Sequence, residues 1–384
     1  MQIPRSLTCT IATLAIVASP AAQEPIVAIR ARAMVDVERG RLIENVTLIV
    51  QGARIARAGP SADVPVPANA TVIQLPDTTL LPGLIDAHVH LTLAGDPRAN
   101  ARATLAAGFT TVQDLGAAAY GNVRLREAIR AGRVEGPRVV ASGPWLGIAG
   151  GTCDFNGIGV RGAEAFRQRV AEDVKQGVDL IKVCVSAWLA DAVQDPSRYE
   201  ISDEELRAAI DAAHRLGKRV AVHALSESGI GVAVRMGADL IAHGGLPSPD
   251  TVTAMKARGV QQVPTLFSLS TGKPEHVAAL ASAMRRAVSA GLPIAFGTDA
   301  GVIAHGDNAR EFEHFASIGV DPAAAIRAAT VSGARAVGMP DDIGLLSSGR
   351  LADVIGVAGN PLLDLRALQK VSFVMKDGKV FKSP

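Results

Sequence analysis

Strand-like and helix-like segments alternate eight times between residues 83 and 342, and this alternation restricts the fold of the 384-residue chain more than any other feature. The strand-like segments are apolar runs at 83–90, 110–116, 137–143, 178–185, 218–224, 239–245, 260–266 and 293–299. Clear helical patterns cover 163–177, 202–217, 227–237, 248–259 and 275–291. The pattern over 202–217 opens with Ser202 and Glu205 in the spacing of a capping box.

Eight such units predict an α/β fold, a (β/α)8 TIM barrel, over residues 83–342. An open doubly wound sheet is the alternative, but no GxGxxG fingerprint follows the first strand. The segments on both sides of the barrel are rich in Val, Ile and Thr and are broken by Gly and Pro. We therefore expect residues 23–82 and 343–384 to form one small β-sandwich domain built from both termini.

The first 22 residues have the composition of a signal peptide rather than of the fold. Arg5 precedes an apolar run from Leu7 to Val17, and the small residues Ser19 and Ala21 suit a signal peptidase. The run is too short for a membrane span, which needs about 20 residues. We expect a mature protein that is secreted or periplasmic, with no stable membrane insertion after cleavage.

The composition argues against nucleic acid as a partner and leaves open whether the chain has a disulfide bond. The formal net charge is only +2, no Lys/Arg block stands out, and aromatic residues make up 3% of the chain, so nothing indicates binding to nucleic acid. After removal of the signal, Cys153 and Cys184 remain. Two cysteines in an exported chain can pair or stay as buried thiols, and the sequence does not decide between these.

Six polar residues lie at the ends of the predicted strands, where a barrel carries its active site. They are His88, His90, Lys182, His223, His243 and Asp299. Nitrogen and oxygen donors of this kind suit Zn²⁺, although manganese, cobalt or iron would also fit. The number of donors exceeds one tetrahedral site and indicates two divalent metal ions. A lysine suits such a site if CO₂ converts its amine to a carbamate that bridges both ions.

These residues lie in stretches that resemble the amidohydrolase superfamily. The stretches are LLPGLIDAHVHL, GVDLIKV, RVAVHA, LIAHGG, GTDAG and GLLSSGRLADVIGV, and the resemblance covers the mature chain. A lysine on the fourth strand is similar to a branch with imidazolonepropionase-like proteins and metal-dependent Xaa-Pro dipeptidases or carboxypeptidases. The resemblance implies that His88, His90 and Asp299 hold one ion. It further implies that His223 and His243 hold the other and that carboxylated Lys182 bridges them.

The same resemblance suggests substrate contacts and an assembly. Relatives often carry a tyrosine at the position of Tyr199 that touches the substrate or the oxygen of the scissile carbonyl. Thr152 stands where similar enzymes often have a histidine, so it belongs to the expected pocket wall. His305 follows Asp299 on the loop at the barrel mouth, where a substrate contact is expected. Relatives often assemble, so a homo-oligomer is expected.

Some of these residues could instead have purely structural roles. Lys182 can form an ordinary salt bridge with Asp299 in a site with one metal. Tyr199 can be a packed loop residue. Asp86 is expected to act as a hydrogen-bond acceptor that supports the first strand or a metal ligand. The remaining histidines, His214, His276 and His314, lie on predicted helices, away from the site.

The expected function is that of an exported binuclear hydrolase that cleaves the amide bond of a dipeptide or N-acyl amino acid. A hydroxide shared by the metals attacks the carbonyl carbon, and Asp299 acts first as general base and then as general acid. The same site can attack a lactone or a phosphotriester, which is the alternative reaction. A metal-binding module without catalytic activity is the alternative outside the enzymes.

Overall fold

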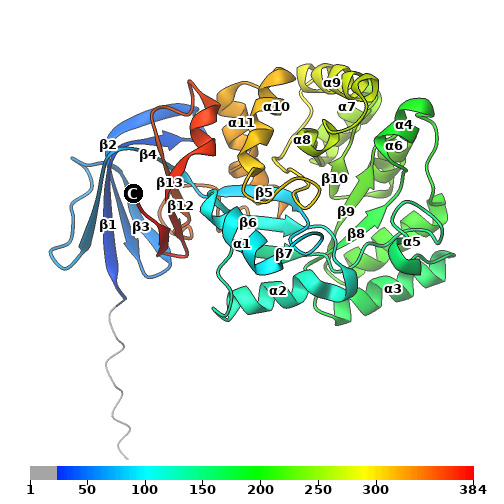
Figure 1. Ribbon diagram of the computed structural model, residues 1–384, viewed down its shortest axis with the longest axis horizontal. Coiled ribbons are helices and arrows are strands. Elements are labelled where there is room, and N and C mark those ends of the chain that lie inside the picture. The colour runs from blue at the N-terminus through cyan, green and yellow to red at the C-terminus, as the bar shows by residue number, and fades with distance from the viewer. Residues whose placement is uncertain (1–23) are drawn as a thin grey trace, which may run out of the picture.

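The computed structural model describes residues 24–384, and Figure 1 shows a β-sheet unit beside a larger unit of strands and helices. The predicted signal peptide, residues 1–22, lies outside the described residues. Within residues 24–384, none of the helices has both the length and the apolar character needed to cross a membrane.

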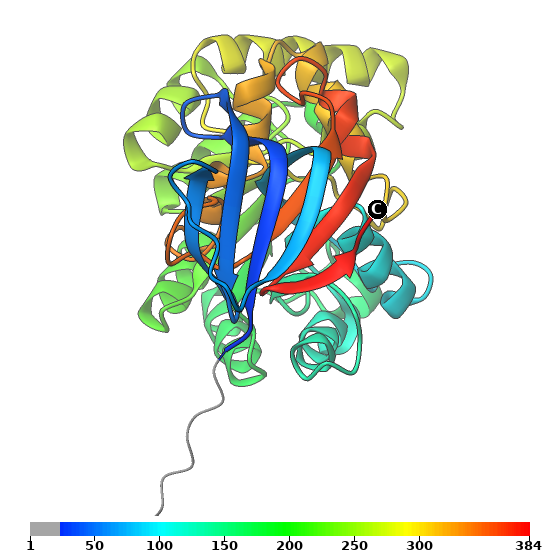
Figure 2. The same cartoon turned by 90° about the vertical axis from the view of Figure 1, so that its left-hand side faces the viewer.

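Strands from both ends of the chain pair in one seven-stranded sheet, with the order β14-β13-β12-β4-β1-β2-β3 (Figure 2). The strands are β1 Ile26–Asp36, β2 Arg41–Gln51, β3 Arg54–Pro60, β4 Thr71–Pro82, β12 Val354–Ala358, β13 Val371–Lys376 and β14 Lys379–Lys382. The junction is the antiparallel pair of β4 and β12, in which Val357 lies opposite Thr79. Within the described residues, strands from both ends of the chain thus belong to one hydrogen-bonded sheet.

The larger unit contains two parallel sheets. One has three strands, β5 Leu84–Val89, β6 Phe109–Asp114 and β7 Arg138–Ala141. The other has four, β8 Leu180–Cys184, β9 Arg219–Ala224, β10 Leu240–His243 and β11 Gln261–Val263. Seven of the eight predicted strands are thus present, and the parallel α/β class is confirmed.

The eighth predicted strand, 293–299, is not a regular strand, and the two sheets do not form one closed barrel. Its backbone still makes isolated parallel bridges on both sides, from Ile294 to Gln262 and from Ala300 to Val89. Pro293 has no N–H to donate, and Asp299 has a left-handed backbone with φ of 60°. These two residues stand at the ends of the segment and limit its length, and within the segment only Ile294 forms a bridge.

Helices follow the strands and cover them (Figure 1). They are α1 Pro97–Ala106, α2 Gly121–Arg130, α3 Ala163–Lys175, α4 Leu189–Gln194, α5 Asp203–Arg215, α6 Glu227–Met236, α7 Pro249–Arg258, α8 Leu266–Leu269, α9 Pro274–Ser289, α10 Glu311–Ser317, α11 Pro322–Ala328 and α12 Val331–Ala336. The capping box of α5 is formed as predicted, because the Ser202 side chain accepts from the N–H of Glu205 and the Glu205 side chain accepts from the N–H of Ser202.

Apolar side chains from both parallel sheets meet beneath the polar strand ends. Leu180 on β8 and Ala221 on β9 belong to one buried cluster with Ala295. Leu180 precedes Lys182 by two residues, and Ala221 precedes His223 by two, so each pair faces the same side of its strand. The strands therefore place polar groups at the mouth above an apolar floor.

Candidate metal centre

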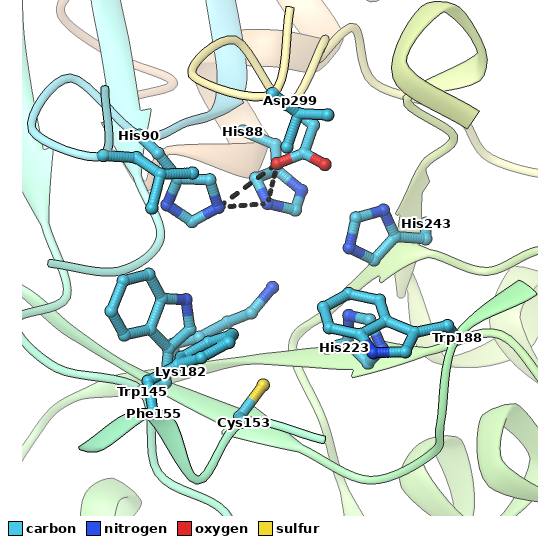
Figure 3. A pocket seen from close by; sticks show the side chains of 12 residues that line it. His88, His90, Trp145, Cys153, Phe155, Lys182, Trp188, His223, His243 and Asp299 are labelled. Carbon is cyan, nitrogen blue, oxygen red and sulfur yellow. Dashed lines mark hydrogen bonds and ion pairs between the residues drawn. The ribbon is translucent and has the colours of Figure 1, made fainter. Parts of the chain in front are cut away.

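Three donors converge where β5 meets the segment that ends at Asp299 (Figure 3). The Nε2 atoms of His88 and His90 lie 3.3 Å apart, and they lie 3.4 Å and 3.2 Å from Asp299 Oδ1. Donors held about 2.1 Å from one tetrahedral ion are about 3.4 Å apart, so this triangle has the size of a metal site. His90 Nδ1 faces the carbonyl oxygen of Gly116 at 3.0 Å, which fixes the ring proton on Nδ1 and leaves Nε2 free to bind a metal.

A second group faces this triangle across the same cavity. The His243 ring lies 4.7 Å from that of His88 and 4.6 Å from that of His223, measured between centroids. Lys182 reaches between the two groups from β8 (Figure 3). Within the described chain, Lys182 Nζ and His223 Nε2 are buried without any hydrogen-bond partner. A buried polar group normally has a partner, so His223 Nε2 fits a bound ion and Lys182 Nζ fits a group that would join it to that ion.

Burial sets the protonation of this second group. Burial, together with the charge of Lys182, lowers the pKa of His223 to about 3 and keeps the ring neutral, as a metal ligand requires. Burial also lowers the pKa of Lys182 to about 7, although the charge of Asp299 opposes this shift. A substantial fraction of Lys182 is therefore an uncharged amine near neutral pH, and an uncharged amine is the form that can add CO₂.

The backbone is strained where these donors lie. His243 and Asp299 both have positive φ, at 66° and 60°, and so does Thr265, at 48°. Non-glycine residues in this region cost about 1–3 kcal/mol, and such strain gathers at functional sites. Thr265 Oγ1 lies 2.8 Å from His243 Nδ1, so one strained residue holds the ring of another.

Buried carboxylates hold the segments that carry the donors. Asp86 does not reach the cavity; it accepts hydrogen bonds from the backbone N–H of His88 and of Thr298, both at 3.1 Å. This matches its expected supporting role. Glu311 accepts from the N–H groups of Leu266 and Phe267 and so anchors the turn that begins at Thr265.

The disulfide question is answered by the structure. Cys153 and Cys184 are bonded, with their Cα atoms 6.1 Å apart. The bond ties the loop that follows β7 to the end of β8, two residues beyond Lys182. It therefore fixes part of the cavity wall to the strand that carries the lysine.

Three expected substrate contacts have other partners in this structure and do not line the cavity. The Tyr199 hydroxyl donates to Asp203 Oδ1 at 2.7 Å. Thr152 donates through its N–H and hydroxyl to the Glu200 carboxylate at 2.9 Å and 2.8 Å, which joins two loops. His305 lies between Thr104 Oγ1 and the carbonyl oxygen of His90, at 3.1 Å and 3.3 Å, so it supports a donor from behind.

The remaining histidines lie elsewhere, as expected. His214 Nε2 is 2.9 Å from Asp239 Oδ2, and His314 stacks on Phe267. Sequence analysis did not single out the apolar residues of the cavity wall, which are Leu93, Trp145, Phe155, Trp188 and Val302 together with Cys153. One signal was available: the chain has only two tryptophans, and both follow predicted strands.

Comparison with known proteins agrees with this geometry. The model of the amidohydrolase family matches residues 79–381, which is most of the chain. The chain belongs to the amidohydrolase family. This confirms the resemblance to the superfamily, whose members are typically metal-dependent, and it confirms that the protein is a hydrolase acting on carbon–nitrogen amide bonds.

Individual relatives point to the same branch. Ochratoxinase from Aspergillus niger is 29% identical over 90% of this chain and 84% of its own length. Imidazolonepropionase from Deinococcus deserti is 27% identical over 86% of this chain and 91% of its own. A solved structure of a Xaa-Pro dipeptidase with methionine in its active site superimposes with a TM-score of 0.86 and 28% identity, over 93% of this chain and 100% of that chain.

Proposed function

We propose that this amidohydrolase is a binuclear enzyme that hydrolyses the amide bond of a small N-acyl amino acid or dipeptide. The observation that carries the proposal is the pair of buried, unpartnered atoms, Lys182 Nζ and His223 Nε2, facing the triangle of His88, His90 and Asp299. One ion accounts for the triangle but leaves the other two atoms without a partner. Two ions account for all of them.

In this proposal His88, His90 and Asp299 would hold one ion, His223 and His243 would hold the other, and Lys182, as a carbamate, would supply further oxygen donors. Zn²⁺ suits this set of nitrogen and oxygen donors. When bound, the ions would acidify an attacking water and polarise the carbonyl of the substrate. The buried apolar cluster beneath the donors gives the site an apolar floor.

Asp299 is the residue that moves protons in this mechanism. Its carboxylate accepts the proton of the attacking water as the C–O bond forms, and it then donates that proton to the amide nitrogen as the C–N bond breaks. The Ser268 hydroxyl lies 3.3 Å from Asp299 Oδ2 and can orient this second oxygen. One carboxylate thus serves both half-steps, and the products are a carboxylic acid and a free amine.

The substrate class is supported by the relatives, among which are a Xaa-Pro dipeptidase and an ochratoxinase. We also propose that the parallel strands close as a (β/α)8 barrel over residues 83–342, with residues 23–82 and 343–384 as the small β domain. The hydrogen bonds of residues 293–300 to both sheets support this closure. Export through a signal peptide at residues 1–22, and a homo-oligomer, remain proposals from the sequence and from the resemblance.

The test is turnover by purified, zinc-loaded protein on a panel of N-acyl amino acids and dipeptides, with lactones and phosphotriesters beside them. We expect release of amino acid from at least one amide. Asp299→Asn is the control, because asparagine tolerates the left-handed backbone at this position, and turnover should fall by about 10²–10⁴-fold with some metal still bound. Turnover of lactones or phosphotriesters without any amide would overturn the proposed reaction, and unchanged turnover in the variant would overturn the proposed role of Asp299.

A further inference from the structure

The mouth of the metal cavity carries an unusual share of the exposed apolar side chains. Eight large apolar side chains are exposed in residues 24–384, and four of them, Leu93, Phe155, Trp188 and Val302, line this cavity. Exposed apolar residues that are scattered singly need no explanation, whereas a cluster around a polar centre marks a binding site. The cluster therefore faces a ligand with apolar parts.

The apolar lining extends beyond the metal donors on one side. A second cavity of about 310 Å³ adjoins the first and shares Leu93, Trp145 and Phe155 with it. Thr92 and Ala118 complete its lining. This space is large enough for an aromatic ring and contains no charged side chain.

Trp145 forms a fixed wall of that pocket. Its ring packs at 4.9 Å from Phe155, edge to face, and at 5.6 Å from the His90 ring, between centroids (Figure 3). A Cβ at Gly116 would lie 2.1 Å from the Trp145 ring, so the ring rests directly on the backbone there. Trp145 is 8% exposed, whereas its neighbours Leu93 and Phe155 are 50% and 38% exposed. The pocket is therefore a partly open groove with one buried aromatic ring in its wall.

The charged side chains that line the two cavities bear on the choice of substrate. Among the described residues that line the two cavities, Asp299 is the only carboxylate, and His88 and His90 already engage it. The α-ammonium group of a dipeptide is one carbon away from the scissile carbonyl, so it would enter the cavity without a free anionic partner. A desolvated charge without a partner is costly, whereas an uncharged acyl group carries no such cost.

We propose that the substrate is an N-acyl amino acid whose acyl group is uncharged and aromatic, and that this group occupies the pocket of Leu93, Trp145 and Phe155. The inference rests on the proposed amide hydrolysis and selects between its two substrate classes. It predicts that the enzyme discriminates against a free ammonium group on the acyl side.

A matched pair of substrates tests this directly. Phenylalanyl-leucine and 3-phenylpropanoyl-leucine differ only in the α-ammonium group and release the same leucine. We expect kcat/KM to be higher for 3-phenylpropanoyl-leucine by at least about 30-fold, because the ammonium group would be buried unpaired. Acetyl-leucine, which lacks the ring, should fall below it by about 10-fold or more, because the apolar area of the ring is then not buried.

Two exposed pocket residues allow variants with little risk to the fold. Leu93→Ala and Phe155→Ala should each raise KM for 3-phenylpropanoyl-leucine severalfold, and by a larger factor than for acetyl-leucine. Leu363→Ala is the matched control, because Leu363 is 82% exposed and does not line either cavity. Equal effects on both substrates would contradict the pocket assignment.

Binding can be followed without turnover, because the two tryptophans of the chain both line this site. In a Trp188→Phe background, Trp145 alone reports, and 3-phenylpropanoyl-leucine should change its emission in the metal-free protein. Failure of the proposed function and failure of the pocket then look different. No hydrolysis with a saturable fluorescence change would refute the reaction alone, whereas hydrolysis that favours phenylalanyl-leucine, or no fluorescence change, would refute the pocket.

Discussion

Asp86→Asn tests whether the buried network behind the metal ligands holds them in place. The carboxylate accepts from four donors: the N–H of His88, the N–H and Oγ1 of Thr298, and Asn308 Nδ2 at 2.8 Å. An amide at this position keeps an oxygen for the two N–H groups but turns its own NH₂ toward Asn308 Nδ2. Two donors then face each other, and the loss of this buried hydrogen bond should lower the free energy of unfolding by about 1–3 kcal/mol.

The reciprocal change should restore the contact. In the double variant Asp86→Asn/Asn308→Asp, the new amide donates to the new carboxylate, so we expect at least half of the lost stability to return. Asn308→Asp alone places two carboxylates beside each other and should be destabilising by itself. The assay is urea unfolding of metal-free protein at pH 7, followed by circular dichroism. A double variant no more stable than Asp86→Asn would refute this account of the network.

The pH dependence gives a second check on the same residue. Burial raises the pKa of Asp86 from 3.8 to about 6, against its hydrogen bonds from Thr298 and Asn308. The folded protein thus binds more protons than the unfolded chain between these values. The contribution of Asp86 to the free energy of unfolding is therefore present below pH 4 and is lost as the pH rises through about 6. A shift of about 2 pKa units corresponds to about 3 kcal/mol, so the stability difference between wild type and Asp86→Asn should narrow by about that amount from pH 4 to pH 7. A difference that does not change with pH would contradict the burial argument.

Two further variants test neighbouring features. Tyr199→Phe removes the hydroxyl that donates to Asp203, so kcat in steady-state turnover should change by less than about threefold, as for a surface hydrogen bond. A loss above 100-fold would show that Tyr199 moves to the substrate, as the resemblance implies. Gly116→Ala places a Cβ against the Trp145 ring, and such overpacking should cost about 1–3 kcal/mol of stability and shift the tryptophan emission; an unchanged thermal midpoint and spectrum would show that the ring can move freely.

The part of the site that the sequence predicts is the part that regular structure controls. His88 and His90, Lys182, His223 and His243 lie at or beside the ends of strands, and alternation along a strand fixes which way each side chain points. Parallel strands then bring these ends together regardless of the sequence between them. The convergence of these side chains was therefore predictable from the strand pattern, whereas their assignment as metal ligands came from the family resemblance.

Loop residues were not accessible in the same way. The direction of Tyr199, Thr152 or His305 depends on a nearby partner, such as Asp203 or Glu200, and no periodic pattern shows that partner. The apolar wall around Trp145 comes from loops for the same reason. A regular eighth strand was predicted from its apolar run, but the run begins with a proline and ends with an aspartate whose left-handed backbone the sequence does not show.

In the proposed site, Lys182 joins two metal ions. The most direct measurement is the metal content per chain of zinc-loaded wild type and Lys182→Ala after removal of free metal. We predict about two ions for wild type and about one for the variant, with partial return of activity when a short carboxylic acid is added in place of the carbamate. Two tightly held ions in the variant, or a single ion in a fully active wild type, would contradict the account.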